Sequence, residues 1–303
     1  MQLHGFSHTG TDWAALTAGG VAPDLLEGNV QPAIAGYRLA RRIGEGRRST
    51  VWLAHGRQGP VALKLVDRSE ASALAHEYET AAVFAHPNIL RVLEQGRAGG
   101  IAYLAMEFAA GGTLAEHLGR PLAPQRVLSL VRQAALALTR LHAANCVHRD
   151  LKPANFLLRA DGSLLLADFG LVLAAGARDP AARPGALFGT PRYVAPEQLQ
   201  GAPAQPAADV YSLGVLLHEL LCGRPPFGGE TLMEVLSQHL VAAVPPLPHE
   251  LAALQPLAEA MLAKDAAQRL PDARAVLQRL DALAGAFFPP VTPAGPAGNR
   301  WNP

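Results

Sequence analysis

The most reactive set of side chains in this 303-residue sequence lies in one eight-residue stretch, His148–Asn155, which reads HRDLKPAN. A carboxylate such as Asp150 can accept a proton from an attacking hydroxyl group. The ammonium group of Lys152 can neutralise negative charge on a group in transfer. Asn155 and Asp168, thirteen residues further along, supply oxygen ligands of the kind that Mg²⁺ prefers. The pattern indicates transfer of a charged group to a hydroxyl with the help of a hard cation.

Two motifs nearer the N-terminus suit the binding of phosphate groups. Glycines within Ile43–Val51 would let backbone amides approach phosphate oxygens without a Cβ in the way, although glycine turns between strands are common. Lys64 ends the apolar run VALK, and a lysine within an apolar strand needs a carboxylate partner. Glu77 and Glu79 are the two candidates for that partner.

The elements that must position these motifs change in type along the chain. Short β-rich runs between glycine turns predict strands at 37–43, 50–55, 61–66, 89–94 and 101–108, with a helix at 70–85. After Gly111-Gly112 the chain is mainly helical, with helices expected at 125–144, at 207–221 and three times more between 230 and 283. This order predicts an α+β fold in two lobes, the first rich in strands and the second helical.

Composition narrows the class of protein. Lys+Arg 26 against Asp+Glu 25 gives a net charge of +1, which argues against nucleic acid as a partner. Two cysteines, Cys146 and Cys222, cannot build a disulfide framework, so we expect a reducing compartment. Neither a spanning apolar segment nor a signal peptide is recognisable, so we expect a cytoplasmic protein with no membrane segment. Lys264 is one of only three lysines, and we assign it no role.

Taken together, the motifs resemble those of the eukaryotic-like (Hanks-type) serine/threonine protein kinases. The matching motifs, in chain order, are the glycine loop, the VALK run, HRDLKPAN, Asp168-Phe169-Gly170 and Ala195-Pro196-Glu197. The resemblance covers residues 37–285, and the composition, rich in alanine and arginine, is similar to that of bacterial members. One short motif can arise by chance, but this series in this order is specific.

The resemblance implies a bilobal protein kinase fold. A small antiparallel β-rich N-lobe with one helix would span 37–107, a hinge 107–112, and a larger, mainly helical C-lobe 113–285. The segment 1–36 would form an N-terminal arm, and the proline-rich segment 286–303 a C-terminal tail.

The resemblance also implies ATP and Mg²⁺ as cofactors and assigns roles to single residues. Lys64 would hold the α- and β-phosphates and pair with Glu77, which stands nine residues before His86 as in the family. Met106 would be the gatekeeper. The residues implied in ATP binding are Ile43, Gly44, Glu45, Gly46, Arg47, Arg48, Ser49, Thr50, Val51, Ala62, Lys64, Glu77, Met106, Glu107, Ala109 and Leu157.

The implied catalytic residues are Asp150 and Lys152 of the eight-residue stretch. Asp150 would orient and deprotonate the substrate hydroxyl, and Lys152 would contact the γ-phosphate. Asn155 and Asp168 would hold Mg²⁺. By the same resemblance, four further polar residues would have structural rather than catalytic roles: His148, Glu197, Asp209 and Arg269.

The implied activity is that of a serine/threonine protein kinase acting on protein substrates. Lys152, together with Thr190 ahead of Ala195-Pro196-Glu197, favours serine and threonine over tyrosine. One alternative is a pseudokinase scaffold that binds ATP or a partner without efficient transfer. Another is that the two terminal segments carry the main function as docking segments.

The sequence departs from the family at two places. Ser49 replaces the third glycine of the loop, and we expect ATP binding to survive because serine is small. Between Leu171 and Gly189, in the segment that corresponds to the family's activation loop, there is no Ser, Thr or Tyr. In the family, an arginine at the position of Arg149 usually pairs with a phosphate on that loop. Asp179 would replace that phosphate, or a regulatory partner would order the loop. Autophosphorylation is then expected outside the loop, at Ser7, Thr9, Thr11, Thr17 or Thr292.

Overall fold

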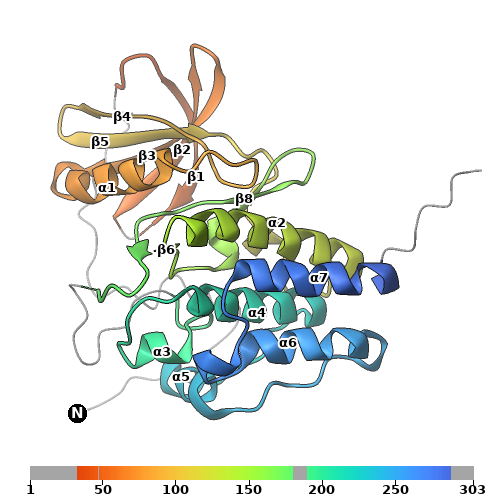
Figure 1. Ribbon diagram of the computed structural model, residues 1–303. Helices are drawn as coiled ribbons and strands as arrows, with labels where there is room; N and C mark the ends of the chain where they lie inside the picture. Colours follow the sequence, from red (N-terminus) through yellow and green to blue (C-terminus); the bar gives the residue numbers. More distant parts are fainter. Residues whose placement is uncertain (1–32, 47, 180–189, 288–303) are drawn as a thin grey trace, which may run out of the picture. The chain divides into compact units, whose positions relative to one another are not determined.

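The computed structural model of the chain describes residues 33–46, 48–179 and 190–287. Most of the expected N-terminal arm and C-terminal tail, with their candidate phosphorylation sites, lies outside these residues, as does Arg47. The chain divides into two compact units, drawn with their element labels in Figure 1. The first unit runs to Tyr78 and includes Val92–Phe108. The second comprises Glu79–Arg91 and the chain from Ala109 onward.

The first unit is built on one antiparallel sheet. Its strands lie in the order β1-β2-β3-β5-β4. The bounds are β1 Arg38–Glu45, β2 Ser49–Gly56, β3 Gly59–Asp67, β4 Val92–Ala98 and β5 Ile101–Glu107. The central strand β3 is nearly all apolar because both of its faces are covered, whereas the edge strand β1 exposes several arginines and buries Leu39. Leu39, Leu63 and Ala105 belong to the apolar core of this sheet.

Helix α1 (Ala71–Ala82) follows β3 through a short 3₁₀ turn, Arg68–Glu70. The carboxylate of Asp67 caps this turn by accepting the Ser69 N–H at 2.8 Å. Leu74, Glu77 and Ala81 are buried at helical spacing, while Glu79 is exposed. The helix therefore turns Glu77, and not Glu79, toward the protein interior.

The strand expected at 89–94 is wrong by about three residues, since β4 begins at Val92. Ile89 and Leu90 are buried, but they pair with Leu166 of the second unit: Leu90 N donates to the Leu166 carbonyl at 2.8 Å. The Asn88 side chain fixes this segment by donating to the Leu164 carbonyl at 2.8 Å. The apolar run at Ile89 and Leu90 therefore correctly indicates buried residues, but these residues do not belong to the sheet of the first unit.

The second unit is mainly helical. Its helices are α2 (Pro124–Ala143), α3 (Pro196–Leu199), α4 (Pro206–Cys222), α5 (Leu232–Val241), α6 (Gln255–Leu262) and α7 (Ala273–Phe287). Two short strand pairs complete it: β6 (Cys146–Val147) with β9 (Leu173–Ala174), and β7 (Phe156–Leu158) with β8 (Leu164–Leu166). The helices expected near 125–144 and 207–221 are confirmed, whereas the four-residue α3 was not anticipated.

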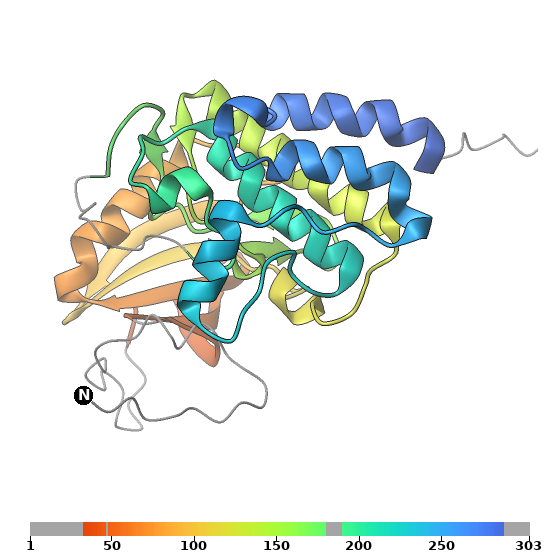
Figure 2. The ribbon, with the colours of Figure 1, turned by 90° about the horizontal axis from the view of Figure 1, so that it is seen from below.

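Helix α4 forms the centre of the second unit. It packs against α2, α6 and α7, as Figure 2 shows from below. Every residue from Ala207 to Leu221 is buried, which explains why this helix is apolar on all sides. Gly223 ends it with a φ of 72°, a conformation that favours glycine. The predicted α+β class, with a strand-rich first part and a helical second part, is confirmed. Among the helices described, none has the length and apolar character needed to cross a membrane.

Candidate active site

Asp150 is held from both of its carboxylate oxygens. Lys152 Nζ lies 2.7 Å from Oδ2, and Thr190 Oγ1 donates to Oδ1 at 3.2 Å. Asn155 Nδ2 donates to Oδ2 at 3.1 Å and to the Asp150 carbonyl at 2.9 Å. The residue is only 8% exposed. This set of contacts fixes the direction in which the carboxylate can accept a proton.

The loop that carries Asp150 is fixed to helix α4 by Asp209. This buried carboxylate accepts the N–H groups of His148 and Arg149, both at 2.8 Å, and contacts His142 Nε2 at 3.0 Å. Complete burial acts to raise the pKa of Asp209. The hydrogen bond and charge of His142, the charge of His148 and the Arg149 N–H outweigh this effect and lower the pKa. Asp209 is therefore an ionised support for the loop.

The backbone around Asp150 is strained. Arg149 has a φ of 72° and Asp168 a φ of 64°, in the left-handed region that residues with a side chain rarely occupy. The two N–H bonds to Asp209 hold the first of these conformations in place. Strain of this kind persists only where the surroundings impose it, and it is concentrated at functional sites.

Asn155 and Asp168 are brought together by the strand pair β7–β8. Ala167 N donates to the Asn155 carbonyl at 2.9 Å, which links the two segments one residue before Asp168. Because the Asn155 amide nitrogen is bound to Asp150, its Oδ1 is the atom suited to a cation. Two oxygen donors fit Mg²⁺, which usually takes few protein ligands and keeps water and phosphate oxygens around it. In the described part of the chain, no group of three or more His, Cys, Asp or Glu residues is placed to hold a metal ion.

Phe169, next to Asp168, packs inside the second unit. It is 2% exposed, stacks on Phe84 with ring centroids 6.0 Å apart and meets the His148 ring edge-on at 5.6 Å. His148 also contacts the Ala167 carbonyl through Nε2 at 3.2 Å. These contacts hold the His148 ring against Phe169 and the Ala167 carbonyl.

In the first unit, Lys64 and Glu77 form a two-point ion pair. Lys64 Nζ lies 2.8 Å from Oε1 and 2.7 Å from Oε2 of Glu77. The two side chains are 19% and 10% exposed. The expected choice of Glu77 over Glu79 is confirmed at the level of this contact. Lys64 stands opposite Val51 on β2 and opposite Leu104 on β5.

The glycine loop connects β1 to β2. Gly46 N donates to the Ser49 carbonyl at 2.8 Å, and a Cβ on Gly46 would lie 2.7 Å from Ser49 Oγ. A side chain at position 46 would therefore require the Ser49 hydroxyl to rotate away. Arg48, expected at the nucleotide, forms an ion pair with Glu70 at 2.7 Å in this structure.

The other residues expected around the nucleotide are divided between the two units. Ala62 pairs with Met106 and Val61 with Glu107 in the register of β3 and β5. The second unit holds Ala109 and Leu157, and Leu157 forms a bridge with Thr113.

Three contacts of the site were missed by sequence reasoning. Thr190 reaches Asp150, His142 reaches Asp209, and Gln198 Nε2 donates to the Arg149 carbonyl at 3.1 Å. Thr190 carried a usable signal, since it is the first hydroxyl after the hydroxyl-free segment. His142 and Gln198 carried none, because each is one of several similar polar residues on a helix.

Arg149 forms an ion pair with Asp179. Arg149 Nη2 lies 2.8 Å from Asp179 Oδ2, and the side chains are 10% and 12% exposed. Arg149 Nη1 also contacts the Leu171 carbonyl at 3.4 Å. The contact anticipated between these two residues is present. The segment from position 180 to 189 lies outside the described residues.

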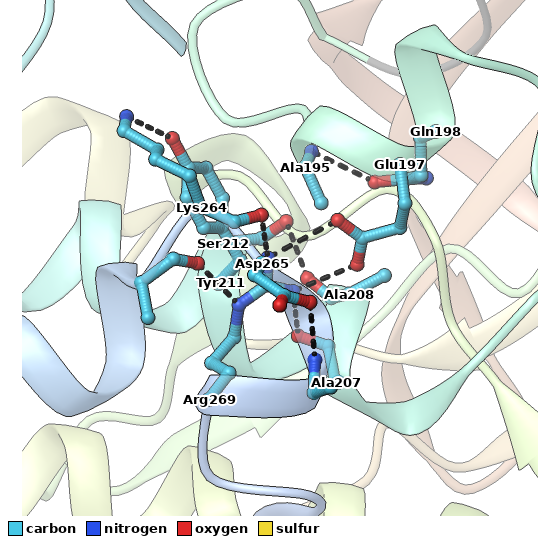
Figure 3. A network of polar contacts seen from close by, with 12 residues as sticks. Ala195, Glu197, Gln198, Ala207, Ala208, Tyr211, Ser212, Lys264, Asp265 and Arg269 are labelled. Carbon is cyan, nitrogen blue, oxygen red and sulfur yellow. Dashed lines mark hydrogen bonds and ion pairs between the residues drawn. The ribbon is translucent and has the colours of Figure 1, made fainter. Parts of the chain in front are cut away.

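Another buried ion pair joins Glu197 of α3 to Arg269, which lies between α6 and α7, as Figure 3 shows. Arg269 Nη1 and Nη2 lie 2.7 and 3.1 Å from the carboxylate oxygens of Glu197, and Nη1 donates to the Ala207 carbonyl at 2.7 Å. The Arg269 side chain is fully buried. Lys264, to which no role was assigned, lies 3.6 Å from the centre of the Phe227 ring and donates to Tyr211 Oη at 3.2 Å. Both arrangements support packing and lie outside the set around Asp150.

Comparison with known proteins agrees with this geometry. Residues 37–280 match the family profile described as protein kinase domain. The serine/threonine-protein kinase PknL of Mycobacterium tuberculosis is 37% identical over 269 residues, which cover 82% of this chain and 65% of that protein. The serine/threonine-protein kinase PknA of the same species is 36% identical over 284 residues, which cover 88% of this chain and 65% of PknA. The chain thus spans less than two thirds of the length of these curated relatives.

Proposed function

Because the chain belongs to the protein kinase family, we propose that it is an ATP-dependent serine/threonine protein kinase acting on protein substrates. The observation that carries the proposal is the contact set of Asp150, whose two carboxylate oxygens are held by Lys152, Asn155 and Thr190. The names of the relatives PknL and PknA support the same activity.

Asp150 accepts the hydrogen bond of the attacking substrate hydroxyl and takes its proton as the new bond forms. Lys152, already 2.7 Å from Asp150, contributes positive charge where negative charge gathers during transfer. Thr190 holds the other carboxylate oxygen, so that Asp150 keeps its orientation. The protein thus contributes position and charge, which is what phosphoryl transfer requires.

ATP supplies the phosphoryl group and Mg²⁺ neutralises its charge when both are bound. Asn155 and Asp168 would hold the cation through oxygen atoms. Lys64, kept in place by Glu77 at 2.7 Å, would hold the α- and β-phosphates. The backbone of the glycine loop from Ile43 to Val51 would cover the phosphates.

We also propose that Asp179 takes the place of an activation-loop phosphate. A carboxylate 2.8 Å from Arg149 supplies the negative charge that a phosphate would bring. A regulatory partner that orders the loop is the other hypothesis, and it predicts that the purified chain alone is inactive.

A cytoplasmic location is part of the same proposal. The free cysteines Cys146 and Cys222, which suit a reducing compartment, support it.

Incubation of the purified chain with Mg²⁺ and labelled ATP, with and without a generic acceptor protein, tests the proposed activity. Asp150→Asn is expected to lower the transfer rate by about 10²–10⁴-fold, the usual contribution of a general base. Asp161→Asn is the matched control, because Asp161 is exposed and accepts the N–H of Ser163, two residues away. Transfer that persists in Asp150→Asn contradicts the proposal. Binding of ATP without transfer by the unaltered chain favours the pseudokinase alternative.

A further inference from the structure

A cavity of about 540 Å³ lies in the second unit, and none of its lining residues belongs to the set around Asp150. Three segments line it: positions 121–124 at the start of α2, 218–226 at the end of α4, and 245–251 before α6. Its volume falls in the range of about 300–1,000 Å³ that is usual for ligand sites. Nothing in the proposed phosphoryl transfer makes use of it.

The walls of this cavity are preformed. Seven of the lining residues are prolines, whose φ is fixed by the ring. Leu122 N donates to the Leu220 carbonyl at 2.9 Å, and a Cβ on Gly223 would lie 2.9 Å from the Pro121 ring, so the α2 and α4 walls are in contact. The third wall is held by Leu247 N, which donates to Gln255 Oε1 at 2.8 Å. An occupant would therefore meet a surface that needs little reorganisation.

The floor of the cavity is neutral and its rim is charged. Burial lowers the pKa of His218 and raises the pKa of the Cys222 thiol, so neither side chain is charged at neutral pH. His218 Nδ1 contacts the Arg224 carbonyl at 3.3 Å, and Nε2 lies 3.8 Å from Cys222 Sγ. The side chains of Arg224 and Glu250 are exposed on the rim. The site thus suits an apolar group that has a charged neighbour.

Helix α7 leads the chain toward this cavity. It runs antiparallel to α2, because Ala273 N donates to His142 Nδ1 at 3.2 Å while Asp281 pairs with Arg132 (Figure 1). From Asp281 to the end of α7 at Phe287 there are six residues, which advance the helix by about 9 Å along α2. The first turn of α2, at Pro124, is eight residues or about 12 Å from Arg132. The end of α7 therefore lies near the α2 wall of the cavity.

The sequence beyond α7 has the composition that the cavity requires. Residues 288–303 read FPPVTPAGPAGNRWNP, with one charged side chain, Arg300, next to Trp301. Sixteen extended residues reach up to about 50 Å, which is ample for the return to the cavity. A tryptophan side chain offers the largest apolar surface for burial against proline rings and leucines.

We propose that residues 288–303 bind back into this cavity of the same chain, with Trp301 in the apolar hollow and Arg300 paired with Glu250. The tail then covers Cys222 and joins the ends of α2, α4 and α7. This contact is independent of phosphoryl transfer, so it can be present whether or not the chain is an active kinase.

Cys222 reports on the occupancy of the cavity, and Cys146 serves as an internal reference. The two thiols are free and partly exposed, and only Cys222 lines the cavity. The experiment compares maleimide labelling rates, followed by mass spectrometry, in the full chain and in a chain that ends at Phe287. A tail bound for about nine tenths of the time slows labelling of Cys222 about tenfold. Truncation is thus expected to raise the Cys222 rate about tenfold and to leave the Cys146 rate unchanged.

Point variants of the full chain locate the contact. Trp301→Ala is expected to reproduce the effect of truncation, whereas Trp13→Ala is expected to have none. Glu250→Gln should release part of the protection, and the matched change Glu230→Gln at another exposed glutamate should not.

Equal Cys222 rates in the full chain, the truncated chain and Trp301→Ala would overturn the proposal. Protection that disappears on dilution would also overturn it, because the tail of a second copy would then be the occupant. A synthetic peptide of residues 288–303 provides an independent measurement. It should restore protection of Cys222 when added to the truncated chain, and failure to do so at any concentration counts against the proposal.

Discussion

The ion pair between Arg149 and Asp179 makes a quantitative prediction about activation. The change is Asp179→Asn, which removes the charge and keeps the size of the side chain. Asp179 and Arg149 are 12% and 10% exposed, so water screens their interaction only weakly. A hydrogen bond between charged groups contributes about 1.5–3 kcal/mol.

This energy converts into an expected loss of activity. At about 1.4 kcal/mol for each factor of ten, 1.5–3 kcal/mol corresponds to a shift of about 10–150-fold in the population of the ordered state. If Asp179 replaces an activating phosphate, the transfer rate to an acceptor protein falls by a factor in this range. The rate is measured with labelled ATP at saturating Mg²⁺, and ATP affinity is measured in parallel to show that the variant is folded.

Two comparisons separate activation from general damage. Asp281→Asn removes the same charge from an exposed pair with Arg132, where the side chains are 61% and 47% exposed, and it should leave activity unchanged. Arg149→Gln and the double variant Asp179→Asn with Arg149→Gln complete a double-mutant cycle. The two losses in transfer rate are expected not to add, because both changes break the same ion pair.

Full activity in Asp179→Asn would refute the reasoning. A second refuting result is an unaltered chain whose activity requires a stoichiometric phosphate at Thr190. In that case a phosphate, and not Asp179, would supply the negative charge.

Three further predictions follow from the contacts described. Glu197→Ala leaves the buried guanidinium of Arg269 without its charge partner, and urea unfolding should show a loss of about 3–5 kcal/mol, whereas a loss under 1 kcal/mol would contradict the pairing. Burial and the nearby charge of Lys264 lower the pKa of His239 to about 4, so its folded state binds fewer protons than the unfolded state between pH 4 and 6.5. The unfolding free energy should fall by up to about 3 kcal/mol as pH drops from 6.5 to 4, and His239→Gln should remove that part of the slope, measured by unfolding at each pH. Lys64→Met should weaken ATP binding and transfer together while thermal unfolding stays cooperative, and unchanged ATP affinity would exclude a role at the phosphates.

Much of the fold could be predicted because its signals are local. Helices α2 and α4 both begin at prolines, and α2 also follows an apolar period, so the bounds of the two helices were predicted within about two residues. The strand expected at 89–94 failed for a nonlocal reason: the Asn88 side chain holds that segment against β8, whose residues come about 75 positions later. An apolar run in the sequence indicates that its residues are buried, but it does not show which unit buries them.

The part of the candidate site that lies within one short segment of the chain could be predicted from the sequence. Asp150, Lys152 and Asn155 contact one another within five residues, so their order in the chain already implied their proximity. Thr190 and His142 could not be placed in this way, since they reach their partners across 40 and 67 residues.

The sequence by itself determined the chemistry of this protein, because residue type and short-range order set which groups can accept a proton, carry charge or bind a cation. The family's spacing to His86 favoured Glu77 over Glu79 as the partner of Lys64, and the structure has that contact because the helix turns only Glu77 inward. Tertiary structure alone decided that Asp209 supports the loop, that Glu197 neutralises Arg269 and that three proline-rich segments enclose a cavity. These features depend on residues far apart in the chain, and only the packing of the helices around α4 brings them within contact.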